Sequence, residues 1–217
     1  MKDVLVILAG YVLGSLPWGY WLPWVVAGVD IRRVGSGNTG AANVWRTVGF
    51  KVALSVALLD IAKGLAAALV GLWLGDELLG LLAGIAAMIG HWRPLFMGLR
   101  RGGKMVATTG GVALALAPLA TLAAGGVWIL AFLVTRYTSI GSMLSVVALP
   151  FLGVLLGASW LVVAFAAGAA VAIVVLHRAN ISRLLAGTEN RFELRRRRDE
   201  GRHVTLPRAR KGAREPS

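Results

Sequence analysis

Residues 107–135 read ATTGGVALALAPLATLAAGGVWILAFLVT, and this stretch decides how the chain is threaded. As a single helix it would measure about 43 Å, whereas the hydrocarbon core of a bilayer is about 30 Å thick. The stretch is therefore either one long tilted span or two short spans. The breaks that its residues suggest lie near Pro118, Gly125 and Gly126.

The composition of the whole chain indicates a membrane protein. Of 217 residues, 57% are apolar and 15% are charged, against about 45–50% and about 25% in soluble domains. Such a chain has too little polar surface to cover itself in water, so lipid must cover the rest. The chain has no cysteine, which excludes a disulfide framework and a thiolate metal site.

The distribution of basic residues decides between one span and two. The other apolar stretches are 4–28, 52–74, 78–91, 140–157 and 158–176. If residues 107–135 cross the membrane once, loop 92–106 and the basic segment after 177 lie on opposite sides. Two crossings place both on the side of loop 30–51, as the positive-inside rule favours. We therefore predict an all-α, polytopic membrane helix bundle of about seven transmembrane helices, N-terminus out and C-terminus in.

The C-terminal region is strongly basic. Twelve Lys and Arg stand against five Asp and Glu between His177 and Ser217, within a chain of net charge +13. Because this surplus lies beside apolar spans, anionic membrane lipids are favoured as its partner over nucleic acid. We predict a membrane-embedded domain over 1–190 and a basic, disordered cytoplasmic tail over 191–217. The sequence carries no signal of oligomeric state.

Residues 35–46, GSGNTGAANVWR, resemble an anion-binding loop. Glycines let backbone N–H groups converge on an anion, and a following helix N-terminus adds donors and a favourable dipole. Asn43 and Arg46 are three residues apart and share one helix surface, from which Arg46 can bind phosphate oxygens. The alternative is a flexible loop between helices. The predicted phosphate ligands here are Gly35, Ser36, Gly37, Asn38, Gly40, Asn43 and Arg46.

Residues 100–110, RRGGKMVATTG, repeat this pattern. Gly102 and Gly103 precede the cation Lys104 and a helix start, but Met105 follows Lys104, so the P-loop spacing is absent. The alternative is a basic cluster that reaches toward the lipid headgroups. Two glycine-plus-cation loops on one membrane face predict a site that holds two anionic groups together.

A third candidate block is residues 177–189, HRANISRLLAGTE. His177, Asn180 and Arg183 follow one side of a short predicted helix, which ends near Gly187. A histidine at a membrane boundary is often only interfacial. Beside two phosphate-type loops, a functional role for His177 is favoured.

Two further observations restrict the chemistry. Asp60 and Lys63 lie three residues apart in an apolar span, which predicts a local ion pair that supports the site. None of the three histidines is followed by Asp five residues on, and neither a metal-ligand spacing nor a G-x-S-x-G sequence is present. Covalent and metal mechanisms are therefore disfavoured, and no metal or cofactor is expected.

In order and spacing, the three blocks resemble the signature motifs of the bacterial acyl-phosphate:glycerol-3-phosphate acyltransferases. The resemblance runs from residue 10 to 190. It includes Gly14 to Tyr20, Asp60 to Gly64, and Gly90-His91. The chain departs from the family at Ala42, where Thr is usual, at Met105, where Gly is usual, and at Leu176, where Arg is usual. The chain also has one residue more than the family's second motif, near Arg100 and Arg101.

The resemblance implies transfer of an acyl group from acyl phosphate to the 1-hydroxyl of glycerol 3-phosphate. The products would be lysophosphatidic acid and phosphate. The location implied is the bacterial inner membrane, with the active face toward the cytoplasm. Acyl phosphate is already activated, so direct attack by the hydroxyl needs mainly positioning, which contributes on the order of 7–11 kcal/mol.

The resemblance also implies roles for single residues. Lys104 and Arg46 would neutralise phosphates, and Ser36, Asn38, Asn43 and Asn180 would orient them. His177 would act as general base or as a phosphate-orienting donor, unless the substrate's own phosphate takes the proton. Thr108 and Arg183 complete the expected phosphate-binding set. The alternative functions are a small anion transporter and a catalytically weakened, lipid-binding member of the family.

Overall fold

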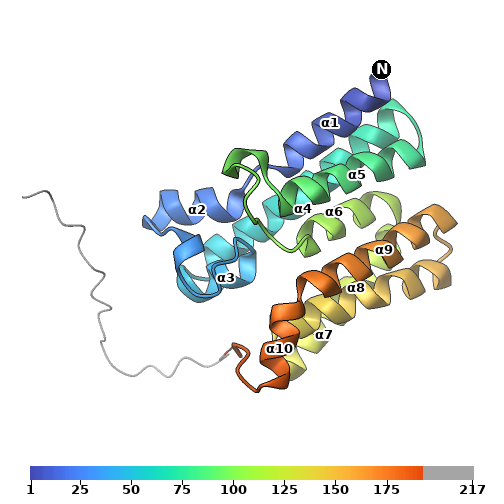
Figure 1. Cartoon of the computed structure of the whole chain (residues 1–217). Helices are drawn as coiled ribbons and strands as arrows, with labels where there is room; N and C mark the ends of the chain where they lie inside the picture. The colour runs from blue at the N-terminus through green and yellow to red at the C-terminus, as the bar shows by residue number, and fades with distance from the viewer. Residues whose placement is uncertain (193–217) are drawn as a thin grey trace, which may run out of the picture.

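The computed structural model describes residues 1–192, and among these it contains helices and no strand (Figure 1). The long helices are α1 (Lys2–Gly14), α2 (Trp18–Ala27), α4 (Phe50–Leu74), α5 (Glu77–Trp92), α6 (Val106–Leu116), α7 (Pro118–Thr135), α8 (Thr138–Leu155) and α9 (Trp160–Leu176). The short ones are α3 (Ala41–Thr47), α10 (Arg178–Leu185) and the 3₁₀ turns η1 (Ile31–Arg33) and η2 (Leu95–Met97). The prediction of an all-α fold is confirmed.

The ambiguous stretch 107–135 forms two helices that meet at Ala117. Pro118 is the first residue of α7, where its missing N–H removes no intrahelical hydrogen bond. The prediction of two segments broken near Pro118 is therefore confirmed. A break at Gly125 or Gly126 is wrong, because α7 continues through both.

Five helical segments within residues 1–192 are long and apolar enough to cross a membrane, and a sixth qualifies if α9 and α10 count as one bent span. The first of these segments joins α1 and α2. Helix α6 is apolar but has only 11 residues, about 16 Å, so it reaches roughly halfway across the hydrocarbon core. The protein is a polytopic membrane helix bundle, whereas the number seven and the orientation of the termini stay predictions.

The helices pack as two groups, which lie side by side in Figure 1. Helices α1, α4, α5 and α6 form the first group, and α7, α8 and α9 form the second. In the first group the backbones approach closely through glycine: a Cβ at Gly64 would overlap the carbonyl oxygen of Thr108, and one at Gly111 that of Ile61. This is the small-residue packing expected between membrane helices.

The glycine-rich and basic segments gather at one end of the bundle, as predicted. In Figure 1, α2, α3 and α10 lie at the end away from the N-terminus. Asn38 Nδ2 donates to the carbonyl oxygen of Gly102 at 3.1 Å, and Lys104 Nζ donates to Asn180 Oδ1. At the opposite end, Ser159 Oγ donates to Glu77.

The folded part extends past the predicted boundary at residue 190. Phe192 is buried, and its N–H donates to the carbonyl oxygen of Arg136 at 2.9 Å. The described structure thus continues to residue 192, and the division into a membrane domain and a tail stays a prediction. The rest of the predicted basic tail, 193–217, lies outside the described residues.

Candidate active site

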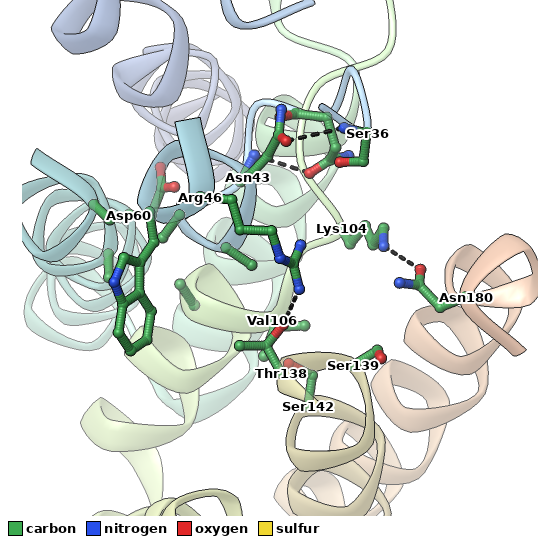
Figure 2. Close-up of a pocket in the computed structure, with 18 of the residues that line it drawn as sticks. Ser36, Asn43, Arg46, Asp60, Lys104, Val106, Thr138, Ser139, Ser142 and Asn180 are labelled. Atoms are coloured by element: carbon green, nitrogen blue, oxygen red, sulfur yellow. Dashed lines mark hydrogen bonds between the residues drawn. The ribbon is translucent and has the colours of Figure 1, made fainter. Parts of the chain in front are cut away.

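A cavity of about 520 Å³ opens between the two helix groups, near the end where the loops gather (Figure 2). Its lining divides by chemistry. The polar lining residues include Ser36, Arg46, Lys104, Thr138, Ser139, His177, Asn180 and Arg183, and the apolar ones include Phe50, Ala53, Leu54, Ala57, Trp128 and Phe132. One cavity therefore offers cations and hydrogen-bond donors together with a hydrocarbon-like wall.

The first loop is held in shape by the side chain of Asn43. Its Oδ1 accepts from the Ser36 N–H at 3.0 Å, and its Nδ2 donates to the carbonyl oxygens of Ile31, Val34 and Asn38. Both amide protons are thereby used inside the loop, so Asn43 has none to donate to a phosphate. Asn43 lines the cavity, and in this structure its side chain orders the loop, so its role as a phosphate ligand stays a prediction.

The glycines and Asn38 of this loop also shape it. Gly35 and Gly37 adopt φ of +59° and +68°, the left-handed region that glycine tolerates best. Asn38 Oδ1 accepts from the Gly40 N–H at 2.8 Å, while its Nδ2 bonds to Gly102. Asn38 thus connects the two loops that the sequence singled out.

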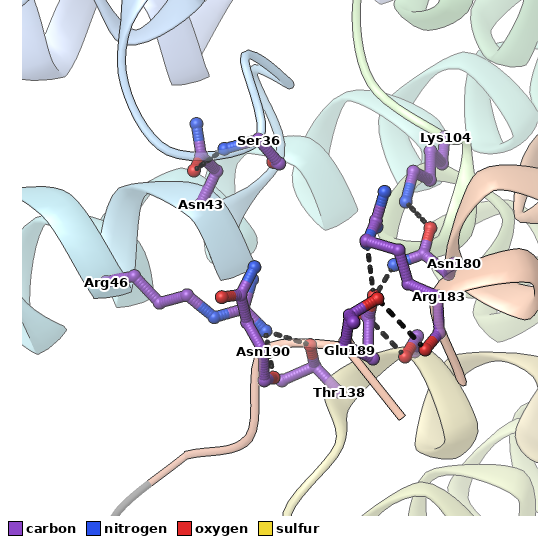
Figure 3. Close-up of polar contacts among 11 residues, drawn as sticks. Ser36, Asn43, Arg46, Lys104, Thr138, Asn180, Arg183, Glu189 and Asn190 are labelled. Carbon is purple, nitrogen blue, oxygen red and sulfur yellow. Dashed lines mark hydrogen bonds and ion pairs between the residues drawn. The ribbon is translucent and has the colours of Figure 1, made fainter. Parts of the chain in front are cut away.

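Arg46 reaches from α3 across the cavity to the second helix group (Figure 3). Its Nη2 donates to Asn190 O at 3.2 Å and, more weakly, to Thr138 Oγ1 at 3.4 Å. The guanidinium lies 4.4 Å from the centre of the Phe192 ring, a cation–π distance. Its buried Nε has no hydrogen-bond partner among the described residues, so this group keeps a donor for an anion.

Lys104 stands just before α6 and points toward α10, where it meets Asn180. Burial is the largest influence on this ammonium group and lowers the pKa of Lys104 to about 8, with Glu189 opposing and Arg183 adding to that effect. The neighbouring Met105 has φ of +69°, a left-handed conformation that explains why glycine is usual there. Its side chain is buried in an apolar cluster with Met88, Ile173 and Leu176.

Glu189 organises the third block (Figure 3). Its Oε1 accepts from Asn180 Nδ2 at 2.6 Å and from Ser139 Oγ at 3.0 Å, and its Oε2 accepts from Arg183 Nε at 2.6 Å. Burial raises the pKa of Glu189, but these three hydrogen bonds outweigh it, so the pKa lies below its usual value. The carboxylate therefore stays charged and aligns both Asn180 and Arg183.

His177 lines the cavity and is 3% exposed. Its Nδ1 lies 2.8 Å from the carbonyl oxygen of Ile173. A carbonyl only accepts, so Nδ1 carries the proton and Nε2 of the neutral ring is left as the acceptor. This assignment gives His177 one nitrogen able to take a proton.

A second, smaller cavity lies at the same end of the bundle, between the first loop, Lys104 and α10. Four of the predicted ligands line neither cavity, namely Gly35, Gly102, Gly103 and Thr108. Thr108 is fully buried against Gly64 of α4, and its role as a phosphate ligand stays a prediction. Gly102 and Gly103 lie against α5, where a Cβ at Gly103 would overlap Nε2 of His91. Their role is to let the second loop approach α5.

The predicted ion pair between Asp60 and Lys63 is present, with Asp60 Oδ1 2.8 Å from Lys63 Nζ. His91 joins it, with Nδ1 3.4 Å from the same oxygen. Sequence reasoning assigned no role to His91, Thr138, Ser139 or Glu189. Glu189 had a signal, since it is the single carboxylate among the basic residues of its block.

Comparisons with known proteins agree with this geometry. Residues 4–187 match the family model described as glycerol-3-phosphate acyltransferase. Proteins named glycerol-3-phosphate acyltransferase include one from Synechococcus sp. (strain JA-3-3Ab), 46% identical over 88% of this chain and 94% of its own. Another, from Desulforudis audaxviator (strain MP104C), is 44% identical over 89% of this chain and 97% of its own.

Solved structures give the same result. Crystal structures of PlsY (YgiH), an integral membrane glycerol 3-phosphate acyltransferase, match in the glycerol 3-phosphate form with a TM-score of 0.84 and in the lysophosphatidic acid form with 0.82. Their identities to this chain are 36% and 35%, and each match covers 89% of this chain and 96% of the other. This multi-span membrane protein therefore belongs to the glycerol-3-phosphate acyltransferase family.

Proposed function

We propose that the protein transfers a fatty acyl group from acyl phosphate to the 1-hydroxyl of glycerol 3-phosphate, releasing lysophosphatidic acid and phosphate. The observation that carries this proposal is the composition of one cavity. Arg46, Lys104 and Arg183 line it together with apolar side chains from α4 and α7. Both proposed substrates carry phosphate, and one also carries a hydrocarbon tail.

In the proposed reaction, the glycerol hydroxyl oxygen attacks the carbonyl carbon of acyl phosphate. The bond between that carbon and the phosphate oxygen breaks, and the phosphate leaves with the electron pair. The hydroxyl proton passes to Nε2 of His177 or to a phosphate oxygen of the substrate. No covalent acyl-enzyme forms, so the rate gain comes from positioning and from charge neutralisation.

The cations have distinct roles in this scheme. Lys104 and Arg46 neutralise the phosphates, including the departing one, and Arg183 supports them from α10. Ser36 and Asn180 orient phosphate oxygens, while Gly40 and Asn38 shape the loop around them. The wall that contains Phe50, Leu54 and Trp128 receives the acyl chain.

We further propose that the cavity faces the cytoplasm and that the membrane is the bacterial inner membrane. The positive-inside rule supports this orientation, because basic loops gather at the cavity end. Soluble glycerol 3-phosphate then enters from the cytoplasm, and the acyl donor stays in the membrane. On the basis of sequence, Arg195 to Arg198 bind anionic lipids at about 1 kcal/mol per basic residue near the surface.

Purified protein in mild detergent, given acyl phosphate and glycerol 3-phosphate, tests the proposal. We expect lysophosphatidic acid and phosphate in equal amounts, with product requiring both substrates. Uptake of glycerol 3-phosphate into proteoliposomes without turnover would favour an anion transporter. Folded protein that binds lipid but makes no product in detergent or in lipid would favour a weakened family member.

His177→Ala separates the two routes for the proton. If Nε2 takes the proton, kcat falls and the acidic side of the pH–rate profile changes. An unchanged profile, with the variant folded, would assign the proton to the substrate's phosphate.

A further inference from the structure

A buried polar cluster lies beside the cavity and has no part in the reaction described above. It consists of Asp60 and Lys63 on α4 and His91 on α5, each no more than 7% exposed. Asp60 and His91 also line the cavity. Burying charges between membrane helices is costly, and an ion pair holds helices together no better than apolar packing does. The cluster therefore calls for a function beyond holding α4 and α5 together.

One side of the cluster contacts the backbone between α1 and α2, and the other side contacts the second glycine loop. Lys63 Nζ lies 2.8 Å from Asp60 Oδ1 and also donates to the carbonyl oxygen of Leu16 at 3.1 Å. Leu16 belongs to the break between α1 and α2. Asp60 Oδ1 is in turn 3.4 Å from Nδ1 of His91, an electrostatic contact that places the imidazole ring beside the ion pair.

The other edge of the His91 ring faces the second glycine loop. A Cβ at Gly103 would overlap Nε2 of His91, so the loop backbone lies directly on the imidazole. Two backbone hydrogen bonds fasten the loop at this place: the Gly102 N–H donates to Trp92 O at 2.8 Å, and the Gly103 N–H donates to His91 O at 3.1 Å. Lys104 is the next residue, so a shift of the ring moves the cation.

We propose that the cluster of Asp60, Lys63 and His91 positions Lys104, with His91 as the surface on which the Gly102–Gly103 backbone rests. In this proposal the three are positioning residues, which act on Lys104 through the loop backbone. Because Gly102 O accepts from Asn38, the same support reaches the first loop. The kinetic expectation rests on the proposed acyl transfer, whereas the structural expectation does not.

A double-mutant cycle with Lys104→Ala tests the kinetic part. His91→Asn keeps a donor toward Asp60 but removes the ring edge under Gly103, and Asp60→Asn keeps the shape but removes the charge. Each is expected to lower kcat/KM for glycerol 3-phosphate roughly 10- to 100-fold, as small misplacements of catalytic groups do. In the Lys104→Ala background the same changes should cost about threefold or less, because they act through Lys104.

Ser145→Ala is the matched control. Ser145 is also a buried polar residue, but it lies on α8 and does not line the cavity. Its small effect on kcat/KM should be the same in both backgrounds. If His91→Asn and Asp60→Asn each lower kcat/KM by the same factor in the wild-type and in the Lys104→Ala background, the proposal is overturned.

Hydrogen exchange tests the structural part without any turnover. In Asp60→Asn and His91→Asn, amides of residues 98–106 should exchange about tenfold faster, while those of α8 stay unchanged. Lower thermal stability with unchanged exchange at 98–106 would mean that the cluster only joins α4 to α5, and would overturn the proposal. If the wild-type protein makes no lysophosphatidic acid, the proposed function is refuted. Faster exchange at 98–106 in the two variants would still support the positioning role. If His91→Asn fails to fold, the exchange measurement on Asp60→Asn alone still tests the positioning role.

Discussion

The two helix groups pack by different means. In the first group, α4 meets α6 through Gly64 and Gly111, each pressed against a carbonyl oxygen of the other helix. In the second group, a Cβ at Gly125, Gly126 or Gly168 would meet no described atom within 4 Å. Gly141 of α8 is intermediate, since its Cβ would lie 3.0 Å from the carbonyl oxygen of Trp128, so glycine brings the backbones closer in the first group than in the second.

This difference in packing matches the part of the cavity that each helix group supplies. The first group bears both glycine-rich loops, whose backbone must be held accurately, and its helices are joined backbone to backbone. The second group and the helix α10 that follows it contribute side chains, with Thr138 and Ser139 on α8 and Asn180 and Arg183 on α10. Polar contacts such as Lys104 to Asn180, and an aromatic cluster around Phe132, join the groups at the cavity.

Removal of the cation between the groups should have the largest effect. Lys104→Ala is expected to lower kcat/KM by about 10²- to 10³-fold, the usual loss when one charge-stabilising donor is removed. Lys51→Ala is the control, since Lys51 is exposed, lies at the same end of the bundle and does not line the cavity. Steady-state kinetics measure kcat/KM for both variants. A similar decrease in kcat/KM for Lys104→Ala and Lys51→Ala would contradict the assignment of Lys104 to the site.

Glycine substitutions test the packing contrast itself. Gly111→Ala places a methyl group against the backbone of α4 and should lower the free energy of unfolding by about 1–3 kcal/mol. Gly168→Ala meets no described atom and should change it by less than about 0.5 kcal/mol, or raise it. Thermal unfolding in detergent measures both, and equal changes would remove the distinction between the groups.

The pH dependence of activity should report the environment of Lys104 between the groups. With a pKa of about 8, Lys104 is charged below that pH and loses its charge above it. The value of kcat/KM should therefore fall above pH 8, by about tenfold per pH unit. Lys104→Arg keeps its charge and should move this fall to higher pH, and an unshifted profile would point to another group.

The aromatic contact between the groups should have the smallest effect. Phe192→Leu removes the ring under the Arg46 guanidinium and should cost about 0.5–1 kcal/mol of unfolding free energy. Phe151→Leu, at a position 72% exposed on α8, is the control and should cost less. Urea or thermal unfolding compares them, and a larger loss at Phe151 would speak against a role for Phe192 in joining the groups.

The sequence predicted the arrangement of helices well because charge and proline act locally. Basic loops at one end required two segments within 107–135, and Pro118 marked the break. Gly125 and Gly126 misled, because glycine within an apolar helix can lie on an outward face without ending the helix. Composition alone does not distinguish such a glycine from Gly111, which has a backbone packed against it.

The site was only partly predictable. Arg46, Lys104, His177 and Asn180 all line one cavity, as their motifs suggested. The sequence did not predict that the Asn43 side chain orders the first loop, because its three acceptors are backbone carbonyls, and no side-chain pattern reveals backbone acceptors. Residues such as Thr138 and Ser139 come from a helix with no motif, and only the fold brings them to the cavity.

The contact of Arg46 with Asn190 has a consequence for biosynthesis. The two residues are 144 positions apart, and synthesis proceeds from the N-terminus. The first helix group and both glycine loops are therefore complete while α7 to α10 have yet to emerge from the ribosome. A chain that stops before α7 keeps the first helix group but lacks the cavity wall that α7 to α10 supply, so we expect such truncated products to be membrane-bound but inactive.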